Sequence, residues 1–359
     1  MTKHSSFKKV VRRHAQDTGQ RYTDALTDLK GLEARLFHAP TPERLLAHLK
    51  GRYGVDAVAA TKLSQHNDHV FRIDRRDGEP WIARVFPPAR PKAGADGDAA
   101  VLRFLEGHGY PAERLATEEA VSTFDGASVV VTRFIDGRLL PSEPPAAVAE
   151  KFAIMGDLMG RLHALPLDAS VSRPGGASGE DPSREGAPRQ DLLAALSFLD
   201  AVDTKVAAAA RARFDALREQ VRSADAGEGL PEALVHGALL HAPDHVVVGD
   251  AGPVAIQWKA AGRGPRLADL AYLLWGTWLN ADWIDAAVGA YRRHVELTDE
   301  ELERLEAVMY VRPLYLLSFD YRRSVAAGRQ PDGGERWWGG IDPTYIAAAA
   351  SAARAAFRR

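Results

Sequence analysis

The sequence predicts an α+β protein with a strand-rich amino-terminal part, a larger helix-rich carboxy-terminal part and a helical extension ahead of both. Residues 55–86 contain short apolar runs that alternate with polar residues, which is typical of half-buried strands. Residues 146–165 and 191–222 carry apolar side chains at helical spacing, and helical patterns dominate from residue 265 to the end. Residues 7–37 show helical spacing of their own, in two stretches separated by Gly19.

Length and composition indicate a globular chain with a substantial core and exclude several kinds of site. The 359 residues are enough for two lobes, and 46% hydrophobic with 26% charged residues is typical of soluble proteins. A formal net charge of −2 gives no overall attraction to nucleic acid or to acidic membranes, so we expect neither as a partner. The absence of cysteine excludes disulfides, thiol nucleophiles and thiolate metal sites. Because the sequence contains no secretory signal and no membrane-spanning run, we expect a cytoplasmic protein.

Residues 1–40 are expected to form a basic helical extension. Residues 1–38 hold eight Lys and Arg against four Asp and Glu. Such an excess most often marks a solvated helical face, and nucleic-acid binding is the less favoured explanation. The other roles open to this extension are contact with a protein partner and self-association.

Residues 41–137 are expected to form an N-lobe built on strands. The run 69–86 predicts a β-hairpin with its turn at Asp77-Gly78. Residues 99–109 predict a short helix closed by glycine, and residues 127–137 predict another strand.

Residues 138–359 are expected to form a helical C-lobe that contains a single β-hairpin. Residues 166–190 are rich in Gly, Pro and Ser and predict a loop. The hairpin lies in the stretch "LVHGALLHAPDHVVVGDAGPVAIQWKAAG", residues 234–262. There a His-Gly pair follows an apolar run, a polar loop comes next, and a "GDAG" turn then joins two short β-rich runs.

This order of elements resembles the aminoglycoside phosphotransferase and choline kinase-like families, which have a protein-kinase-like fold with two lobes. Their catalytic segment has the form His-Gly-Asp, a short loop ending in Asn, two strands, and Ile-Asp-Trp. Here "LVHG", "VVVGDAGPVAIQW" and "AAGRGPRLADLAYLLW" follow that outline from residue 234 to 275, and "LMGRLHALP" and "TRFIDGRLL" extend it upstream. The resemblance covers roughly residues 55–325 and leaves residues 1–40 outside.

The resemblance implies a kinase that holds ATP or GTP and neutralises the transferred phosphoryl group with Mg²⁺. The family uses the Asp after His-Gly as base or orienting group, and the loop Asn and the Asp of Ile-Asp-Trp as magnesium ligands. Those positions fall here on Ala238, on Asp244 or His245, and on Gln257. An alanine cannot accept a proton and a glutamine carries no charge, so both catalysis and Mg²⁺ binding are in doubt. Asp244 is the remaining candidate for a metal ligand.

The nucleotide side of the family's site is partly present in this sequence. "LSQHNDHVFRI" takes the place of a glycine-bearing phosphate loop, with Asn67 near its tip and no glycine to let backbone N–H groups approach phosphate. Arg84 matches the basic strand residue that contacts phosphates, and Asp98 matches its acidic partner on the next helix. Phe134 lies in "TRFIDGR", which matches the hinge that contacts adenine through backbone groups. The alternative for Arg84 is an ordinary surface strand residue.

Two further residues of the motif have a structural and a functional interpretation. His236 is expected to be structural, holding the catalytic loop by hydrogen bonds, with Asp269 as a candidate partner. Lys259 stands where the family often has an acidic residue, and its default interpretation is a solvated lysine. The functional hypothesis is that the loss of two carboxylates and the gain of an ammonium allow the site to hold an anion without Mg²⁺.

Three functions are compatible with this sequence. The favoured one is a pseudokinase that binds a nucleotide, a small molecule or a protein partner without phosphoryl transfer, because it accounts for Ala238, Gln257 and the missing loop glycine together. The alternative is an active ATP-dependent small-molecule phosphotransferase of antibiotic type, with a rearranged site that uses Asp244 or His241. The third is a different chemistry on the same scaffold, since fold does not fix function.

The ligand of the C-lobe is indicated only by composition. Residues 310–323, "YVRPLYLLSFDYRR", supply aromatic and basic side chains, which favour a flat, anionic or aromatic ligand over a polycation. Tyr315, Phe319 and Tyr321 are equally explained as core residues, and that is the more common role of aromatics at helical spacing.

Overall fold

A computed structural model describes most of the chain after residue 39. The described residues are 40–63, 69–86, 88, 90, 92–140, 145–167, 171, 188–237, 245–326, 328–330 and 341–359. The chain divides into two compact units: unit 1 comprises Met1–Asp96, Ala116–Phe134 and Glu180–Arg184, and unit 2 comprises Gly97–Leu115, Ile135–Gly179 and Glu185–Arg359. The predicted extension, residues 1–40, lies outside the described residues apart from its last residue.

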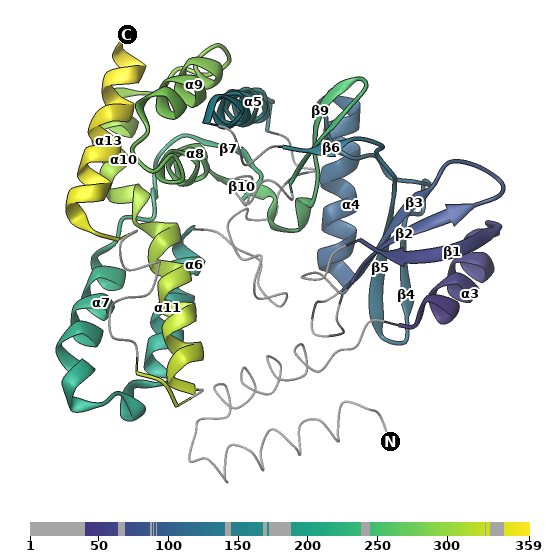
Figure 1. The fold of residues 1–359 in the computed structure, drawn as a ribbon, viewed down its shortest axis with the longest axis horizontal. Helices are drawn as coiled ribbons and strands as arrows, with labels where there is room; N and C mark the ends of the chain where they lie inside the picture. The colour runs from purple at the N-terminus through teal and green to yellow at the C-terminus, as the bar shows by residue number, and fades with distance from the viewer. Residues whose placement is uncertain are drawn as a thin grey trace. The chain divides into compact units, whose positions relative to one another are not determined.

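Unit 1 is built on one antiparallel sheet with the strand order β1-β2-β3-β5-β4 (Figure 1). Its strands are β1 (Ala57–Lys62), β2 (Val70–Arg75), β3 (Trp81–Phe86), β4 (Val121–Phe124) and β5 (Ala127–Arg133), and helix α3 (Pro42–Tyr53) packs against β1. The predicted hairpin is confirmed as β2 and β3, with Asp77-Gly78 between them. β5 is buried along nearly its whole length, because its Val129–Val131 run supplies β-branched side chains to both faces of the sheet.

Unit 2 is mainly helical and contains two small sheets. β7 (Glu232–Val235) pairs with β10 (Gly262–Pro265), and β6 (Arg138–Leu139), β8 (Val246–Gly249) and β9 (Gly252–Ala255) pair in that order. The predicted hairpin of the "GDAG" motif is therefore confirmed as β8 and β9. The helices are α5 (Pro145–His163), α6 (Pro188–Asp200), α7 (Arg211–Ser223), α8 (Arg266–Trp275), α9 (Ala281–Tyr291), α10 (Asp299–Met309), α11 (Val311–Ala326) and α13 (Pro343–Arg358), with short 3-10 turns η2 (Asp203–Lys205), η3 (Ala208–Ala210) and η5 (Trp258–Ala260).

Two predicted helices differ from the observed ones. The helix predicted at 99–109 is α4 (Lys92–Gly107), which begins in unit 1 and continues in unit 2. It starts earlier because the ion pair between Lys92 and Asp96, 2.7 Å at i,i+4 spacing, supports a first turn that contains glycines. The pattern predicted as helical over 191–222 is divided into α6 and α7 by the 3-10 turns between them.

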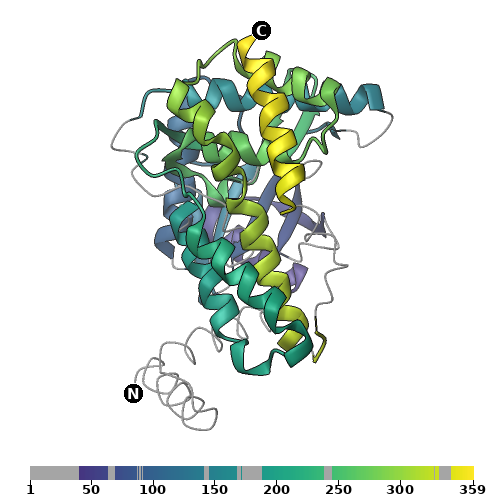
Figure 2. The ribbon, with the colours of Figure 1, turned by 90° about the vertical axis from the view of Figure 1, so that its left-hand side faces the viewer.

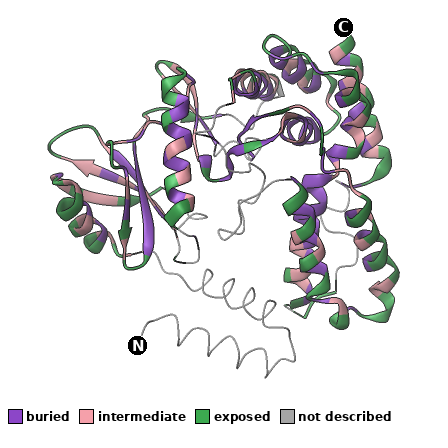
Figure 3. Ribbon diagram, turned by 180° about the vertical axis from the view of Figure 1, so that it is seen from behind, coloured by how far each residue is buried: buried purple, intermediate pink, exposed green. Residues whose placement is uncertain are grey.

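Three helices of unit 2, α6, α7 and α11, enclose an apolar core. α6, α7 and α11 lie side by side (Figure 2), and Leu199, Phe214 and Tyr321 meet in the core between them. Tyr315 is fully buried as well, while Phe319 is half-buried, so the core interpretation of the aromatic residues on α11 holds for both tyrosines. The helices present purple, buried faces inward and green faces to solvent (Figure 3).

Helix α8 lies at the centre of unit 2 and is buried over most of its length, including Asp269. A charged side chain is retained in such a position only when it is well paired. Among the described residues, no helix is long and apolar enough to cross a bilayer.

Two glycines allow α5 and α9 to pack closely. A Cβ at Gly156 would lie 2.2 Å from the carbonyl oxygen of Ala287, and a Cβ at Gly160 would lie 2.7 Å from that of Tyr291. Both contacts are to backbone atoms, which cannot move aside cheaply. The close approach of these helices therefore depends on the absence of side chains on α5.

We predict that Gly156→Ala lowers the free energy of unfolding by about 1–3 kcal/mol, because the added methyl overpacks a backbone contact. The matched control is Gly289→Ala on α9, where a Cβ would meet nothing within 4 Å. It should be neutral or stabilise by up to about 1 kcal/mol through helix propensity. Urea unfolding measures the free energy of unfolding of both variants. An equal change in the two would contradict the close approach of α5 and α9.

Candidate functional site

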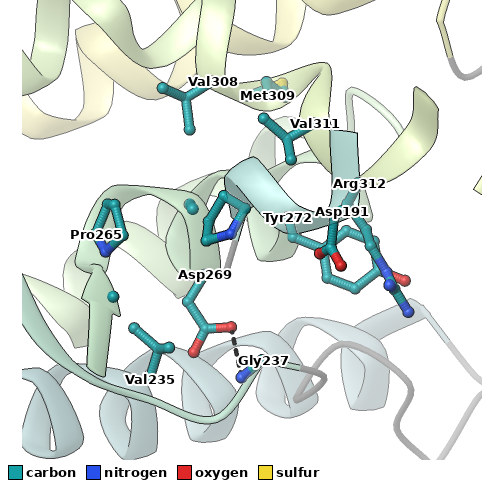
Figure 4. Close-up of a pocket in the computed structure, with 13 residues that line it drawn as sticks. Asp191, Val235, Gly237, Pro265, Asp269, Tyr272, Val308, Met309, Val311 and Arg312 are labelled. Atoms are coloured by element: carbon teal, nitrogen blue, oxygen red, sulfur yellow. Dashed lines mark hydrogen bonds between the residues drawn. The ribbon is translucent and has the colours of Figure 1, made fainter. Parts of the chain in front are cut away.

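The segment that follows β7 is held by one buried carboxylate on α8. The backbone N–H of His236 donates to Oδ2 of Asp269 at 2.9 Å, and the N–H of Gly237 donates to Oδ1 at 3.1 Å. Figure 4 shows the second bond and the position of Asp269 beside the end of β7. Gly237 has φ +78°, a left-handed conformation that glycine adopts without steric cost. Asp269 thereby fixes where the chain enters the loop that begins at residue 238.

The ring of His236 connects the end of β7 with the end of the β8–β9 hairpin. Its Nε2 donates to the carbonyl oxygen of Ile256 at 3.0 Å, and the ring packs on Trp258 with centroids 4.6 Å apart. Because Nε2 carries the donated proton, Nδ1 is unprotonated in the neutral ring. Hydrogen bonds of the kind predicted for His236 are present, with the difference that its bond to Asp269 comes from the backbone and not from the ring.

Asp269 also has a histidine beside it. His163, at the end of α5, places its Nε2 3.7 Å from Oδ2 of Asp269, and its Nδ1 lies 3.0 Å from the hydroxyl of Tyr291. Burial alone would raise the pKa of Asp269, but the nearby ring of His163 and the hydrogen bond from the backbone N–H of His236 outweigh it and hold that pKa below its ordinary value. Asp269 is therefore an ionised acceptor at neutral pH.

Gln257 occupies the position where the resemblance expects a metal-binding aspartate. It has φ +70° and ψ 54°, a left-handed conformation that costs a residue with a Cβ about 1–2 kcal/mol. Its N–H donates to Oε1 of Glu113 at 2.7 Å, and Glu113 is 2% exposed. The N–H of Glu113 in turn donates to the carbonyl oxygen of Ala255 at 3.0 Å. A buried carboxylate 144 residues away thus holds Gln257 in its strained conformation.

Glu113 and His163 are residues of the site that sequence reasoning missed. His163 lies in "LMGRLHALP", which carried the resemblance, but the sequence assigned it no role. Nothing near Glu113 in the sequence connects it with Gln257, since their contact depends on the bridge between Ala112 and Ala255.

Lys259 lies two residues beyond Gln257, at the middle of the 3-10 turn η5, and its side chain is exposed. The turn is anchored by Trp258, whose indole N–H donates to the carbonyl oxygen of Ala255 at 3.1 Å. Its place and exposure do not test the anion-binding role of Lys259, which stays a prediction.

The residues predicted on the nucleotide side fall in different parts of the chain. Arg84 is half-buried on the central strand β3, opposite Val70 of β2 and Val130 of β5. Phe134 in unit 1 donates its N–H to the carbonyl oxygen of Pro80 at 3.0 Å, so that hinge donor is already engaged. Asp98 lies on α4 in the part assigned to unit 2 and is 5% exposed. Residues 64–68, which include Asn67, lie outside the described residues.

The loop that would carry the reactive groups is residues 238–244, and it lies outside the described residues. Ala238, His241 and Asp244 are therefore not placed. His245, the first described residue after the loop, is buried with its ring centroid 5.6 Å from that of His236.

The described part of the site does not fit a magnesium ion. Mg²⁺ prefers carboxylate, phosphate and water oxygens, whereas Gln257 offers an uncharged amide, Lys259 is cationic, and the Glu113 carboxylate accepts the N–H of Gln257. Within the described ranges, no three His, Asp or Glu side chains lie together in a way that could hold a metal ion.

Gln257→Gly should raise the free energy of unfolding by about 0.5–1 kcal/mol, because glycine relieves the left-handed strain and loses part of that gain to unfolded-state entropy. Gln257→Ala is the matched control, since it removes the same amide but keeps the Cβ and should bring no gain. Chemical denaturation distinguishes the two. A stability gain of the same size in both variants would show that the gain comes from loss of the amide side chain and not from relief of the backbone strain.

Acidification should destabilise the fold through His236. Burial lowers the pKa of His236 below its ordinary value of 6.5, against the opposing charges of Asp269 and Glu113. The unfolded chain therefore takes up a proton near pH 6.5 while the folded chain does not. The stability contributed by His236 is fully present above pH 6.5 and is lost toward its lowered folded-state pKa, by up to about 1.4 kcal/mol per pH unit.

Urea unfolding between pH 5 and 8 measures this slope. His236→Gln keeps a donor for Ile256 but does not titrate, so its stability should depend less on pH than that of the wild-type chain. An unchanged slope in the variant would assign the titration to other groups, of which His48 is one because its pKa is also lowered by burial.

Comparison with known proteins identifies the family. Residues 60–307 match the sequence profile described as the phosphotransferase enzyme family. No curated protein matches the sequence significantly.

Solved kinases with low sequence identity share the fold. An amicoumacin kinase in complex with AMP-PNP and Ca²⁺ has a TM-score of 0.55 and 15% identity, over 85% of this chain and 92% of its own. The choline kinase LicA from Streptococcus pneumoniae has a TM-score of 0.57 and 13% identity, over 86% and 98%. A spectinomycin phosphotransferase in complex with ADP and spectinomycin has a TM-score of 0.54 and 12% identity, over 88% and 98%. The predicted α+β, protein-kinase-like fold is thus confirmed, and the chain belongs to the phosphotransferase enzyme family.

Proposed function

We propose that this chain is a pseudokinase of the phosphotransferase family, which binds a nucleotide or another small molecule without transferring a phosphoryl group. The observation that carries this proposal is the environment of Gln257. An uncharged amide stands at the metal-ligand position, on a strained backbone that Glu113 holds by a 2.7 Å hydrogen bond. Phosphoryl transfer depends on positioning and on charge neutralisation, and this residue supplies no charge.

The base position supports the same proposal. Ala238 follows Gly237 directly, and its methyl group neither accepts a proton nor orients a hydroxyl. The surrounding frame is complete, because Asp269 still holds the backbone of His236 and Gly237. A family frame that is retained while its reactive groups are replaced is what selection for binding without chemistry would leave.

The proposed nucleotide is ATP or GTP, bound without a requirement for Mg²⁺. The ammonium of Lys259 would take over part of the charge neutralisation that a metal supplies in an active kinase. We further propose a cytoplasmic protein organised as 1–40, 41–137 and 138–359, in which the basic residues 1–40 contact a protein partner or a second copy of the chain.

Thermal unfolding with ATP, GTP and ADP, each with and without Mg²⁺, tests nucleotide binding. A ligand that binds only the folded state at 100 times its Kd stabilises it by about 2.7 kcal/mol. We expect stabilisation that does not depend on Mg²⁺, and no transfer of radiolabelled phosphate to small hydroxylated compounds or to water. Strong stimulation of binding by Mg²⁺ together with transfer would overturn the proposal.

If transfer occurs, the variants Asp244→Asn and His241→Gln identify the rearranged base of an active enzyme. The converse variant restores the family's groups at the two altered positions, as Ala238→Asp with Gln257→Asp. Aspartate tolerates the left-handed conformation better than most residues, so the frame can accept it at 257. We expect this double variant to gain Mg²⁺-dependent stabilisation by nucleotide, while Ala238→Asn with Gln257→Asn, which adds no charge, should not.

A further inference from the structure

The turn between α8 and α9 holds two bulky residues in a backbone conformation that favours glycine. Trp278 has φ +51° and Leu279 has φ +61°. They are the central residues of a turn that the N–H of Asn280 closes on the carbonyl oxygen of Thr277 at 3.0 Å. Positive φ at both central positions is the pattern of a type I′ turn, in which Asn and Gly are the common residues. Backbone strain of this kind is held in place by the surrounding structure and concentrates at functional segments.

Three helices hold the turn in this conformation. Thr277 bonds to the carbonyl oxygen of Leu274 at the end of α8, through its N–H at 3.1 Å and its hydroxyl at 2.6 Å. Asn280 caps the start of α9 with its side chain. The hydroxyl of Tyr345, on the first turn of α13, donates to the carbonyl oxygen of Trp275. The backbone of residues 277–280 is thus fixed on both sides.

The two central side chains of the turn are exposed. Trp278 is 44% exposed and Leu279 is 41% exposed, and they are the only neighbours in sequence among the exposed large hydrophobic residues that the structure describes. The indole of Trp278 lies against the rings of Trp275 and Tyr345, with centroids 5.4 Å and 5.9 Å apart. The exposed fraction of Trp278 is what remains after these contacts. An apolar pair on a rigid support is typical of the centre of a protein–protein interface.

The surface around the turn is acidic. The turn, the first two turns of α9 and the capped amino-terminal half of α13 contain three aspartates and no lysine or arginine. Asp285 pairs with Arg359, whereas Asp282 and Asp342 are exposed and form no ion pair with any residue that the structure describes. A partner that fits this surface therefore combines apolar side chains with positive charge.

The amino-terminal extension has the complementary composition. Residues 7–16, "FKKVVRRHAQ", contain four Lys and Arg and no Asp or Glu. Phe7, Val10 and Val11 have helical spacing, which predicts an apolar stripe flanked by the basic residues. The segment therefore matches the turn both in apolar character and in charge.

We propose that residues 7–16 of a second copy of the chain dock on the α8–α9 turn. The apolar side chains of the segment cover Leu279 and the exposed part of Trp278, and its lysines and arginines meet Asp282 and Asp342. Each copy has one segment and one turn, so the contact is reciprocal, and the first contact raises the effective concentration for the second. This inference makes specific the self-association of the amino-terminal extension proposed above.

Disulfide trapping between two variants tests the contact, because the chain has no cysteine of its own. One variant carries Val10→Cys or Val11→Cys, and the other carries Leu279→Cys with a carboxy-terminal affinity tag that changes its mass. After mixing under mild oxidation, the faster of the two pairs should form a mixed dimer at least about tenfold faster than the same variant does with Leu193→Cys. Leu193 is a matched control for thiol access, since it lies on α6 and is 45% exposed. Equal rates with Leu279→Cys and Leu193→Cys would overturn the proposal.

The role of charge is tested in the same assay. Adding Asp282→Asn and Asp342→Ser to the Leu279→Cys variant removes both carboxylates, and serine keeps a capping side chain for α13. Trapping should slow at least about threefold, and raising the ionic strength from about 0.05 to about 0.5 M should slow the parent pair in the same way. Unchanged melting temperatures show that the variants are folded. Trapping that does not slow would overturn the charge recognition on which the choice of this segment rests.

Sedimentation of the cysteine-free chain measures self-association directly. Its mass should rise from monomer toward dimer over about a hundredfold range of concentration up to about 100 µM. Leu279→Asp should keep the chain monomeric over that range, and the matched control Leu193→Asp should associate as the wild-type chain does. A chain that stays monomeric throughout would overturn the proposal. It would leave the pseudokinase proposal standing, because neither measurement contains nucleotide.

Discussion

The carboxylate of Asp269 is the contact on which the candidate site depends. One buried anion accepts the N–H groups of His236 and Gly237 with separate oxygens, so the chain leaves β7 in a single direction. The same residue lies on α8, a helix buried over most of its length, and its pKa stays below the ordinary value despite that burial. A neutral side chain would hold these two N–H groups more weakly, because hydrogen bonds to an ionised acceptor are roughly twice as strong as neutral ones.

His236 extends that constraint from the loop to the hairpin. Its ring bonds to the carbonyl oxygen of Ile256, one residue before Gln257, and rests on Trp258, one residue after it. Glu113 fixes the N–H of Gln257 from the other side. One hydrogen-bonded frame of described residues thus holds both the end of β7 at Gly237 and the end of the hairpin at Gln257. The bonds of this frame to Gly237 and Gln257 are made by backbone N–H groups, so they do not depend on the side chain at 257.

Sequence reasoning recovered the parts of the fold that depend on local pattern. The β2–β3 hairpin, the β8–β9 hairpin and the long helix α5 follow from alternation, turn residues and helical spacing, and the structural role of His236 follows from its place in a motif. It did not find Glu113, because a contact across 144 residues leaves no trace in a single sequence. It also did not find the start of α4, where Gly94 and Gly97 indicate a loop but an ion pair and the following apolar turns favour a helix.

The charges near Gln257 are not those of a magnesium site, which is built on carboxylate oxygens. The ammonium of Lys259 stands two residues beyond Gln257, and the buried charged side chains of Asp191 and Arg312 line a cavity behind Gly237. Asp191 and Arg312 are 1% and 4% exposed, so interactions within unit 2 must offset the cost of removing their charges from water.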